Sequence, residues 1–284
     1  MTNDTLKGKC ILITGGSRGI GLAIAKSCAQ SGANLVLCSR NIKELEIAKS
    51  EITSQSSVEV VIVPADVSKA EDNLKIKDII EKKFSKLYGV VAAAGVYGSI
   101  GKFNETPIED WTEAININLN GTARTLHAVY PLLIKNGGGR VILFSGGGQG
   151  PMPNFSPYVT SKGAIWRMTE TLGAEFAADN IYLNAIAPGA VNTKLLEDLI
   201  AAGPEKVGSE FYKKSIQQKE NGGQSPEKAA KLVSYLLSDK SHGLYGKTLS
   251  AIWDEYDKFT DLESMSKSDI YCPRRVVSSD GKTR

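Results

Sequence analysis

The feature that most constrains the fold is an alternation between short apolar runs and longer segments of helix length. The runs are rich in Val, Ile and Leu without polar alternation, which is typical of parallel strands covered on both faces. They occupy residues 10–14, 34–39, 58–63, 88–95, 140–145, 181–189 and 247–253. Segments such as the one that ends at Gly32 separate them and predict right-handed helical crossovers. The sequence therefore predicts an α/β fold with one doubly wound parallel sheet of about seven strands.

A single domain is expected, because 284 residues without an internal repeat or linker suit one large domain. The composition changes only after Trp253, where an acidic stretch precedes a basic one. We place the main domain at 1–252 and an extension at 253–284. The aromatic residues of the extension are Trp253, Tyr256, Phe259 and Tyr271. They predict an ordered extension that covers a neighbouring subunit or the mouth of a pocket, with partial disorder as the alternative.

Composition excludes several classes of function. The net charge is +3 without a basic run, so no nucleic-acid partner is expected. No run of 18 apolar residues occurs, so no membrane span is expected. The polar N-terminal residues lack a signal-peptide core, which predicts a cytoplasmic protein. Four cysteines without CxxC spacing and two isolated histidines predict no metal site.

The first apolar run leads directly into a glycine-rich loop, TGGSRGIG, at Thr14–Gly21. Glycines allow a tight turn and close approach of the backbone to a pyrophosphate, and the following helix offers free N–H groups and its positive end. A glycine-rich turn without a ligand is the alternative. The strand before the loop and the helix after it favour a dinucleotide site.

The end of the second apolar run bears on which dinucleotide binds. Sites for NAD usually carry Asp or Glu there, to bind the ribose 2′-hydroxyl. This chain has Ser39 and Arg40 instead, and Arg18 lies in the glycine loop. Two guanidinium groups suit a 2′-phosphate. We therefore expect NADP(H) to be preferred over NAD(H), with a solvated surface role for Arg40 as the alternative.

A tyrosine and a lysine lie four residues apart in YVTSK, at Tyr158 and Lys162. On a helix this spacing places both side chains on one face. A phenol titrates near pH 10, so work near neutrality requires a drop in its pKa of about 3. One ammonium about 4 Å away, at an effective dielectric of about 20, supplies energy of that order. Beside a cofactor loop, the pair therefore predicts acid–base chemistry, with a chance Tyr and Lys on an exposed helix as the alternative.

From about residue 6 to residue 250, the chain resembles the short-chain dehydrogenase/reductase superfamily. TGGSRGIG matches its TGxxxGxG loop and YVTSK matches YxxxK. PADVS, NINLNG and APGAVNT resemble its adenine-side, asparagine and PG motifs. The resemblance implies a cofactor site made by Gly15, Ser17, Arg18, Gly19, Ile20, Gly21, Ser39, Arg40, Asp66, Val67, Ala94, Gly95, Tyr158, Lys162, Pro188, Gly189, Val191 and Thr193.

The resemblance also implies catalytic residues, namely Asn118, Ser145, Tyr158 and Lys162. Tyr158 would exchange a proton with a small-molecule carbonyl or alcohol substrate while hydride moves to or from nicotinamide. Lys162 would bind the nicotinamide ribose, and Asn118 would hold a water in a proton relay. Similar proteins assemble through the helices after Asn120 and at 158–178, so a homodimer or homotetramer is expected.

The position of the catalytic serine depends on the direction of counting. Counting thirteen residues back from Tyr158 selects Ser145, whereas counting forward from Arg140 places Gly146 at that position. We favour Ser145, because the glycines at 146–148 let the backbone rotate the strand end into place. Ser156 is a poorer substitute, because it lies too close to Tyr158 and on a different face.

Two other functions remain open. One is a nucleotide-binding regulatory protein without catalysis, against which the intact set of Asn118, Tyr158 and Lys162 argues. The other is a sugar-nucleotide-modifying enzyme, whose usual glycine spacing and larger C-terminal domain are missing here.

The chain also departs from the pattern of the family that it resembles. Relatives usually begin the motif at the end of the fourth run with Asn, whereas this chain has AAAG there. The last run lacks the glycine pair that is common in relatives. Residues 194–223 should form a mobile lid, but they do not identify a substrate.

Overall fold

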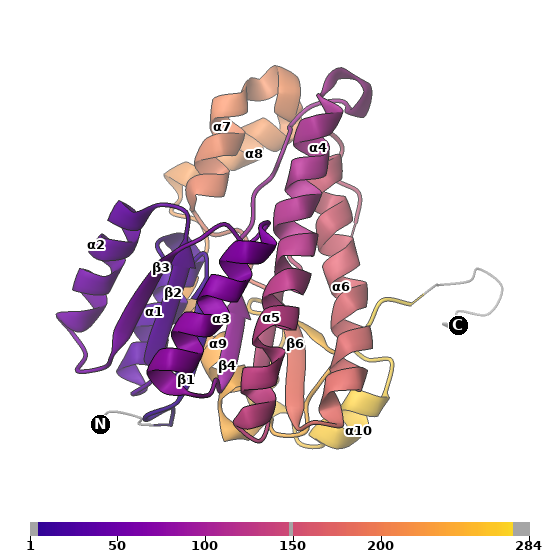
Figure 1. Cartoon of the computed structure of the whole chain (residues 1–284). Coiled ribbons are helices and arrows are strands. Elements are labelled where there is room, and N and C mark those ends of the chain that lie inside the picture. Colours follow the sequence, from indigo (N-terminus) through magenta and orange to yellow (C-terminus); the bar gives the residue numbers. More distant parts are fainter. Residues whose placement is uncertain (1–4, 148–149, 275–284) are drawn as a thin grey trace.

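The computed structural model describes residues 5–147 and 150–274. Its centre is a seven-stranded sheet in the order β3-β2-β1-β4-β5-β6-β7. Every neighbouring pair is parallel. Helices cover both faces (Figure 1). The predicted doubly wound α/β fold is therefore confirmed.

The strands follow the predicted runs closely, with differences at their ends. They are β1 (Cys10–Thr14), β2 (Asn34–Ser39), β3 (Val60–Pro64), β4 (Gly89–Ala92), β5 (Gly139–Phe144), β6 (Ile181–Ala187) and β7 (Thr248–Ser250). β4 ends three residues before the predicted end, because the chain leaves the sheet there to line a cavity. β7 is short because Ser250 begins a turn, in which its N–H donates to Asp254 Oδ2 at 2.6 Å.

The helices divide between the two faces of the sheet. They are α1 (Gly19–Gln30), α2 (Ile42–Thr53), α3 (Ala70–Phe84), α4 (Ile108–Ile115), α5 (Gly121–Lys135), α6 (Ser156–Ala177), α7 (Lys194–Val207), α8 (Ser209–Glu220), α9 (Pro226–Leu237) and α10 (Leu262–Lys267). One core joins the sheet to α1, α2 and α9. A second joins it to α3, α5 and α6. Successive side chains of β1 point to opposite faces of the sheet, so Ile11 packs in the first core and Leu12 in the second.

The connections place a crevice at the carboxyl ends of the strands. β1 lies between β2 and β4, so the chain leaves β1 and β4 for opposite faces of the sheet. Ligands of open α/β sheets bind at such a switch point. The helices α7 and α8 fold from the predicted lid segment and lie at the upper end of the molecule in Figure 1, far from α10.

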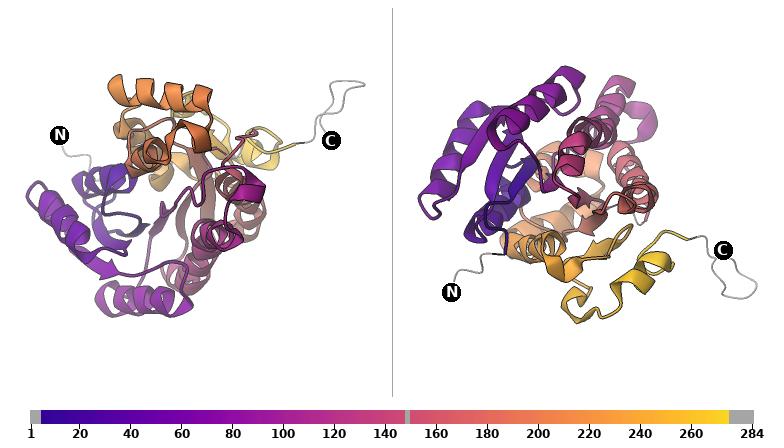
Figure 2. Two further views of the ribbon diagram at one scale, coloured as in Figure 1. Left: turned by 90° about the horizontal axis from the view of Figure 1, so that it is seen from above. Right: turned by 60° about the horizontal axis from the view of Figure 1, so that its bottom comes forward.

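Most of the predicted extension that the structure describes folds back on the body (Figure 2). Tyr256, Phe259 and Tyr271 pack against the core that contains α1 and α9. Arg274 joins the extension to α6 through an ion pair with Glu170, at 2.6 Å between Nη2 and Oε1. Trp253 is 84% exposed, so its side chain does not pack on the body of this chain. Residues 275–284 lie outside the described part.

Within the described ranges, no helix combines the length and apolar character that crossing a membrane requires.

Candidate active site

The glycine-rich loop connects β1 to α1 in a conformation that its glycines make possible. Gly15 has a φ of +68°, in the left-handed region. A Cβ atom on Gly21 would lie 2.2 Å from the carbonyl oxygen of Gly15, which no side chain tolerates. The loop therefore presents its backbone and the first turn of α1 directly to the crevice.

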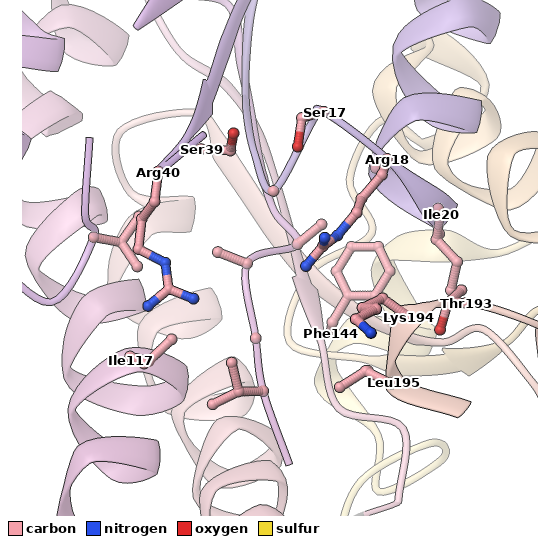
Figure 3. Close-up of a pocket in the computed structure, with 18 of the residues that line it drawn as sticks. Ser17, Arg18, Ile20, Ser39, Arg40, Ile117, Phe144, Thr193, Lys194 and Leu195 are labelled. Carbon is pink, nitrogen blue, oxygen red and sulfur yellow. The ribbon is translucent and has the colours of Figure 1, made fainter. Parts of the chain in front are cut away.

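The crevice contains a cavity of about 440 Å³ (Figure 3). It runs along the ends of β1, β2, β4 and β5, and the start of α7 closes one side. All residues predicted to bind the cofactor line it except Gly189 and Val191. Val191 is buried beside the cavity and forms an isolated bridge with Gln224.

One corner of the cavity is rich in charge. Arg40 extends into it from the end of β2 (Figure 3) and makes no hydrogen bond or ion pair with any described residue. Arg18 donates from Nη1 to Glu44 Oε1 at 3.1 Å. Burial acts to raise the pKa of Asp66, but hydrogen bonds from Ser68 and the charge of Arg40 outweigh it. The Asp66 pKa therefore lies below its ordinary value, so this carboxylate is ionised at neutral pH.

Tyr158 and Lys162 lie one turn apart on α6 and both line the cavity. Lys162 is 7% exposed, and its Nζ donates to the main-chain oxygen of Phe144 at 2.9 Å. The Nζ atom is 5.7 Å from the centre of the Tyr158 ring. Burial lowers the pKa of Lys162 to about 8. The predicted common face of the pair is confirmed.

The pKa of Tyr158 moves opposite to the sequence-based expectation. Burial raises it above the ordinary value, and nearby Tyr97 raises it further. The rings of Tyr97 and Tyr158 meet edge to face at 4.8 Å between centroids. The ammonium of Lys162 does not offset this burial, because it is itself desolvated and directed at a carbonyl. The Tyr158 hydroxyl is therefore protonated at neutral pH.

Asn118 lies in a π-helical turn, η2 (Asn116–Asn120), between α4 and α5. Such turns often occur at functional sites. The side chain is buried, accepts from Val96 N–H at 2.9 Å and donates to Val96 O and Ser161 Oγ, each at 2.9 Å. Asn118 thus connects the loop after β4 to α6. A Cβ atom on Gly95 would lie 3.3 Å from its Oδ1 atom, so the glycine allows this close approach.

Ser145 follows β5 and is fully buried. Its hydroxyl donates to the main-chain oxygen of Lys162 at 3.0 Å. It does not line the cavity, whereas Gly146 does. The structure therefore brings Ser145 next to Lys162 but directs its hydroxyl at the main chain of α6.

A second cavity of about 380 Å³ adjoins the first and shares Val96 and Asp198 with it. It lies between the loop after β4 and α7, and its lining includes Tyr97 and Lys206. Sequence analysis missed Tyr97 and, at the charged corner, Glu44. Glu44 carries one local signal, its place three residues after the helix-capping Asn41. Tyr97 carries none beyond its position after the fourth apolar run.

Among the residues that the structure describes, no group of His, Cys, Asp and Glu side chains is arranged to hold a metal ion.

The sheet order, the glycine loop and the Tyr158–Lys162 pair together define the class as an oxidoreductase of the short-chain type. The family model for short chain dehydrogenases matches residues 9–202. The chain is 32% identical over 247 residues to mouse dehydrogenase/reductase SDR family member 4, covering 87% of this chain and 86% of that protein. It is also 32% identical to an uncharacterized oxidoreductase of Listeria innocua, covering 82% and 92%. The chain therefore belongs to the short-chain dehydrogenase/reductase family.

Solved structures of the family agree with this assignment. NAD⁺-bound xylitol dehydrogenase superposes with a TM-score of 0.79 at 29% identity, over 86% of this chain and 98% of that one. L-sorbose reductase from Gluconobacter frateurii, in complex with NADPH and L-sorbose, gives 0.79 at 26% identity, over 87% and 96%. The two neighbours bind different nicotinamide cofactors.

Proposed function

We propose that the chain is an NADP(H)-dependent oxidoreductase that transfers hydride between nicotinamide and a small carbonyl or secondary alcohol. One observation carries the proposal. The glycine loop, Arg40, Tyr158 and Lys162 line a single continuous cavity at the switch point of the sheet. Cofactor recognition and acid–base chemistry would therefore take place in one site.

The residues present fit a nicotinamide dinucleotide. A pyrophosphate suits the first turn of α1, because Gly19, Ile20 and Gly21 line the cavity there and a helix N-terminus offers free N–H groups to an anion. Arg18 and Arg40 suit a 2′-phosphate. By family resemblance, Asp66 would lie near the adenine, Lys162 at the nicotinamide ribose, and Val191 and Thr193 beside the nicotinamide amide. The bound nicotinamide would supply or accept the hydride.

The chain's own groups would handle the proton. Burial keeps the Tyr158 hydroxyl protonated at neutral pH, which is the state that a reduction requires. It would donate to the oxygen of the substrate as that oxygen becomes an alkoxide. Lys162, whose pKa is about 8, lies one turn away, and Asn118 connects the loop after β4 to α6, the helix that carries the pair.

Ser145 is proposed as the hydroxyl that polarises the substrate carbonyl. In this structure its hydroxyl donates to the Lys162 carbonyl, so the role requires that it exchange this bond for one to the substrate. The adjacent cavity between Tyr97 and Lys206 is proposed to receive the rest of the substrate.

Cofactor titration tests the NADP(H) preference. Protein fluorescence would be followed during addition of NADPH or NADH to the wild type and to Arg40→Ala. We expect tighter NADPH binding by the wild type. Arg40→Ala should weaken NADPH binding about tenfold, because a charge-assisted hydrogen-bond pair is lost, and should change NADH binding less than about twofold. NADH binding as tight as that of NADPH by the wild type would contradict the preference.

A turnover assay tests catalysis itself. NADPH consumption would be measured with a panel of ketones, aldehydes and keto sugars. Consumption that depends on one of these carbonyl compounds is expected. Tight cofactor binding without turnover of any compound would favour the regulatory alternative.

A further inference from the structure

Glu44 places a carboxylate among the groups that the proposed 2′-phosphate would use. It lies in the first turn of α2 and lines the cavity. Its Oε2 accepts from Ser17 Oγ at 3.1 Å. Its Oε1 accepts from Arg18 Nη1 at 3.1 Å and from Asn41 Nδ2 at 3.2 Å. Two residues of the glycine loop are therefore already bound to an anion that belongs to the protein.

The two arginines of this corner differ in consequence. Arg18 is paired with Glu44, whereas Arg40 has no hydrogen bond or ion pair within the described residues. Both line the same cavity, and Figure 3 shows both guanidinium groups directed into it. Arg40 is thus available to an incoming phosphate at once, and Arg18 becomes available only when Glu44 releases or shares it.

We propose that Glu44 is a cofactor-specificity residue, which competes with the 2′-phosphate of NADP(H) for Arg18 and Ser17. The inference rests on the proposed function only in assigning this corner to the adenine ribose. It predicts an NADP(H) preference that is smaller than two unpaired arginines would produce.

The physical reason is charge. A phosphate monoester carries a charge of about −1.5 to −2 at neutral pH. If Glu44 stays in place, a like charge lies beside the phosphate, which is unfavourable. If Glu44 moves away, its hydrogen bonds to Ser17, Arg18 and Asn41 are lost. A 2′-hydroxyl has no charge and can donate to a carboxylate, as it does where Asp or Glu reads NAD. Removing the charge of Glu44 should therefore favour only the phosphorylated ribose.

A purely structural role makes a different prediction. Asn41 caps α2 by accepting from the N–H groups of Lys43 and Glu44 at 3.0 and 3.4 Å. An acidic residue in the first turn also interacts favourably with the helix dipole. If Glu44 served only the helix, its replacement would lower stability without a selective effect on the 2′-phosphate.

The test uses two probes that differ only in the 2′-phosphate, adenosine 2′,5′-bisphosphate and 5′-AMP. Binding of each would be measured by calorimetry for the wild type, Glu44→Gln and Glu46→Gln. Glu46 is a matched control, since it lies on the same helix, is exposed, and has no hydrogen bond or ion pair within the described residues. Glu44→Gln should tighten binding of the bisphosphate about fivefold, as expected for one exposed charge pair. Binding of 5′-AMP should change less than about twofold, and Glu46→Gln should change neither.

A second pair of variants tests the route of the effect. In an Arg18→Ala background, Glu44→Gln should improve bisphosphate binding by less than about twofold, because the contested group is gone. Unchanged or weaker bisphosphate binding by Glu44→Gln would overturn the inference, as would an equal gain in Glu46→Gln or a full gain without Arg18. If the wild type binds both probes equally, the NADP(H) preference fails, and the response to Glu44→Gln still decides the role of Glu44.

Discussion

Ser145 and Lys162 are joined by a hydrogen bond in which the serine hydroxyl donates to the lysine main-chain oxygen at 3.0 Å. The Lys162 side chain returns to the same strand end, where its Nζ donates to the oxygen of Phe144 at 2.9 Å. The end of β5 and the second turn of α6 are therefore connected twice. This double connection sets the position of the lysine relative to Tyr158, and it makes the role of Ser145 open to a direct test.

Ser145→Ala is expected to lower turnover about a hundredfold, because a hydroxyl donor to the substrate oxygen is lost. NADPH binding should be unchanged. Steady-state kinetics and cofactor titration would measure both. Ser156→Ala is a suitable control, because the Ser156 hydroxyl accepts from Trp111 Nε1 at 3.1 Å and Ser156 does not line the cavity. If Ser145→Ala keeps the wild-type turnover and only has a lower melting temperature, the Ser145 hydroxyl has a structural role as the donor to the Lys162 carbonyl. Gly146 then occupies the position of the catalytic serine.

Tyr158→Phe is expected to reduce turnover by at least about a hundredfold, because proton transfer to the substrate is lost. The buried ring stays, so folding and cofactor affinity should be preserved. Tyr97→Phe is the matched variant, since it keeps the edge-to-face contact at 4.8 Å. Comparable activity of Tyr158→Phe and the wild type, in the same ketone assay, would refute the acid–base assignment.

The buried Lys162 should make stability depend on pH. In the unfolded chain its pKa is near 10.5, and in the folded protein it is lowered to about 8. Between these values the unfolded chain binds the extra proton, so this group raises the free energy of unfolding as the pH rises from about 8. Lys162→Met lacks that increase. The difference between the free energy of unfolding of Lys162→Met and that of the wild type should therefore favour the variant more near pH 7.5 than near pH 10. Urea unfolding at both pH values measures this difference. A pH-independent difference would contradict the lowered pKa.

Truncation after Ile252 should lower the melting temperature by several degrees, because packed aromatic side chains and the Arg274–Glu170 ion pair are removed. Tyr271→Ala tests the same contact with the chain intact. Trp253→Ala is the control and should melt as the wild type does, since its side chain is exposed. Unchanged melting and assembly of the truncated chain would show that the extension contributes nothing to the fold.

A homodimer or homotetramer is expected in solution, with α5 and α6 at a symmetric interface, as the family resemblance implies. Light scattering at micromolar concentration measures the mass directly. His127→Glu should reduce the mass, because His127 is exposed on α5 and a charge there would be buried on association. A monomeric wild type would refute the expectation.

Much of the site could be predicted because local sequence determines it. The strand-length runs determined the sheet, since an apolar run without alternation must be covered on both faces. The glycine loop required its glycines, as the 2.2 Å approach at Gly21 shows. The spacing of Tyr158 and Lys162 sufficed to place them on one face of α6, because a helix repeats every 3.6 residues.

The tertiary structure alone decided where side chains point and what surrounds them. Glu44 reaches Ser17 across 27 positions of sequence, and Asn118 binds Val96 and Ser161 from two other elements. No local pattern encodes such partners. The pKa of Tyr158 was wrongly expected to fall, because desolvation depends on the whole set of neighbours and here outweighs the ammonium. Backbone conformation follows from nearby residues, whereas burial and charge follow from segments that meet only in the folded chain.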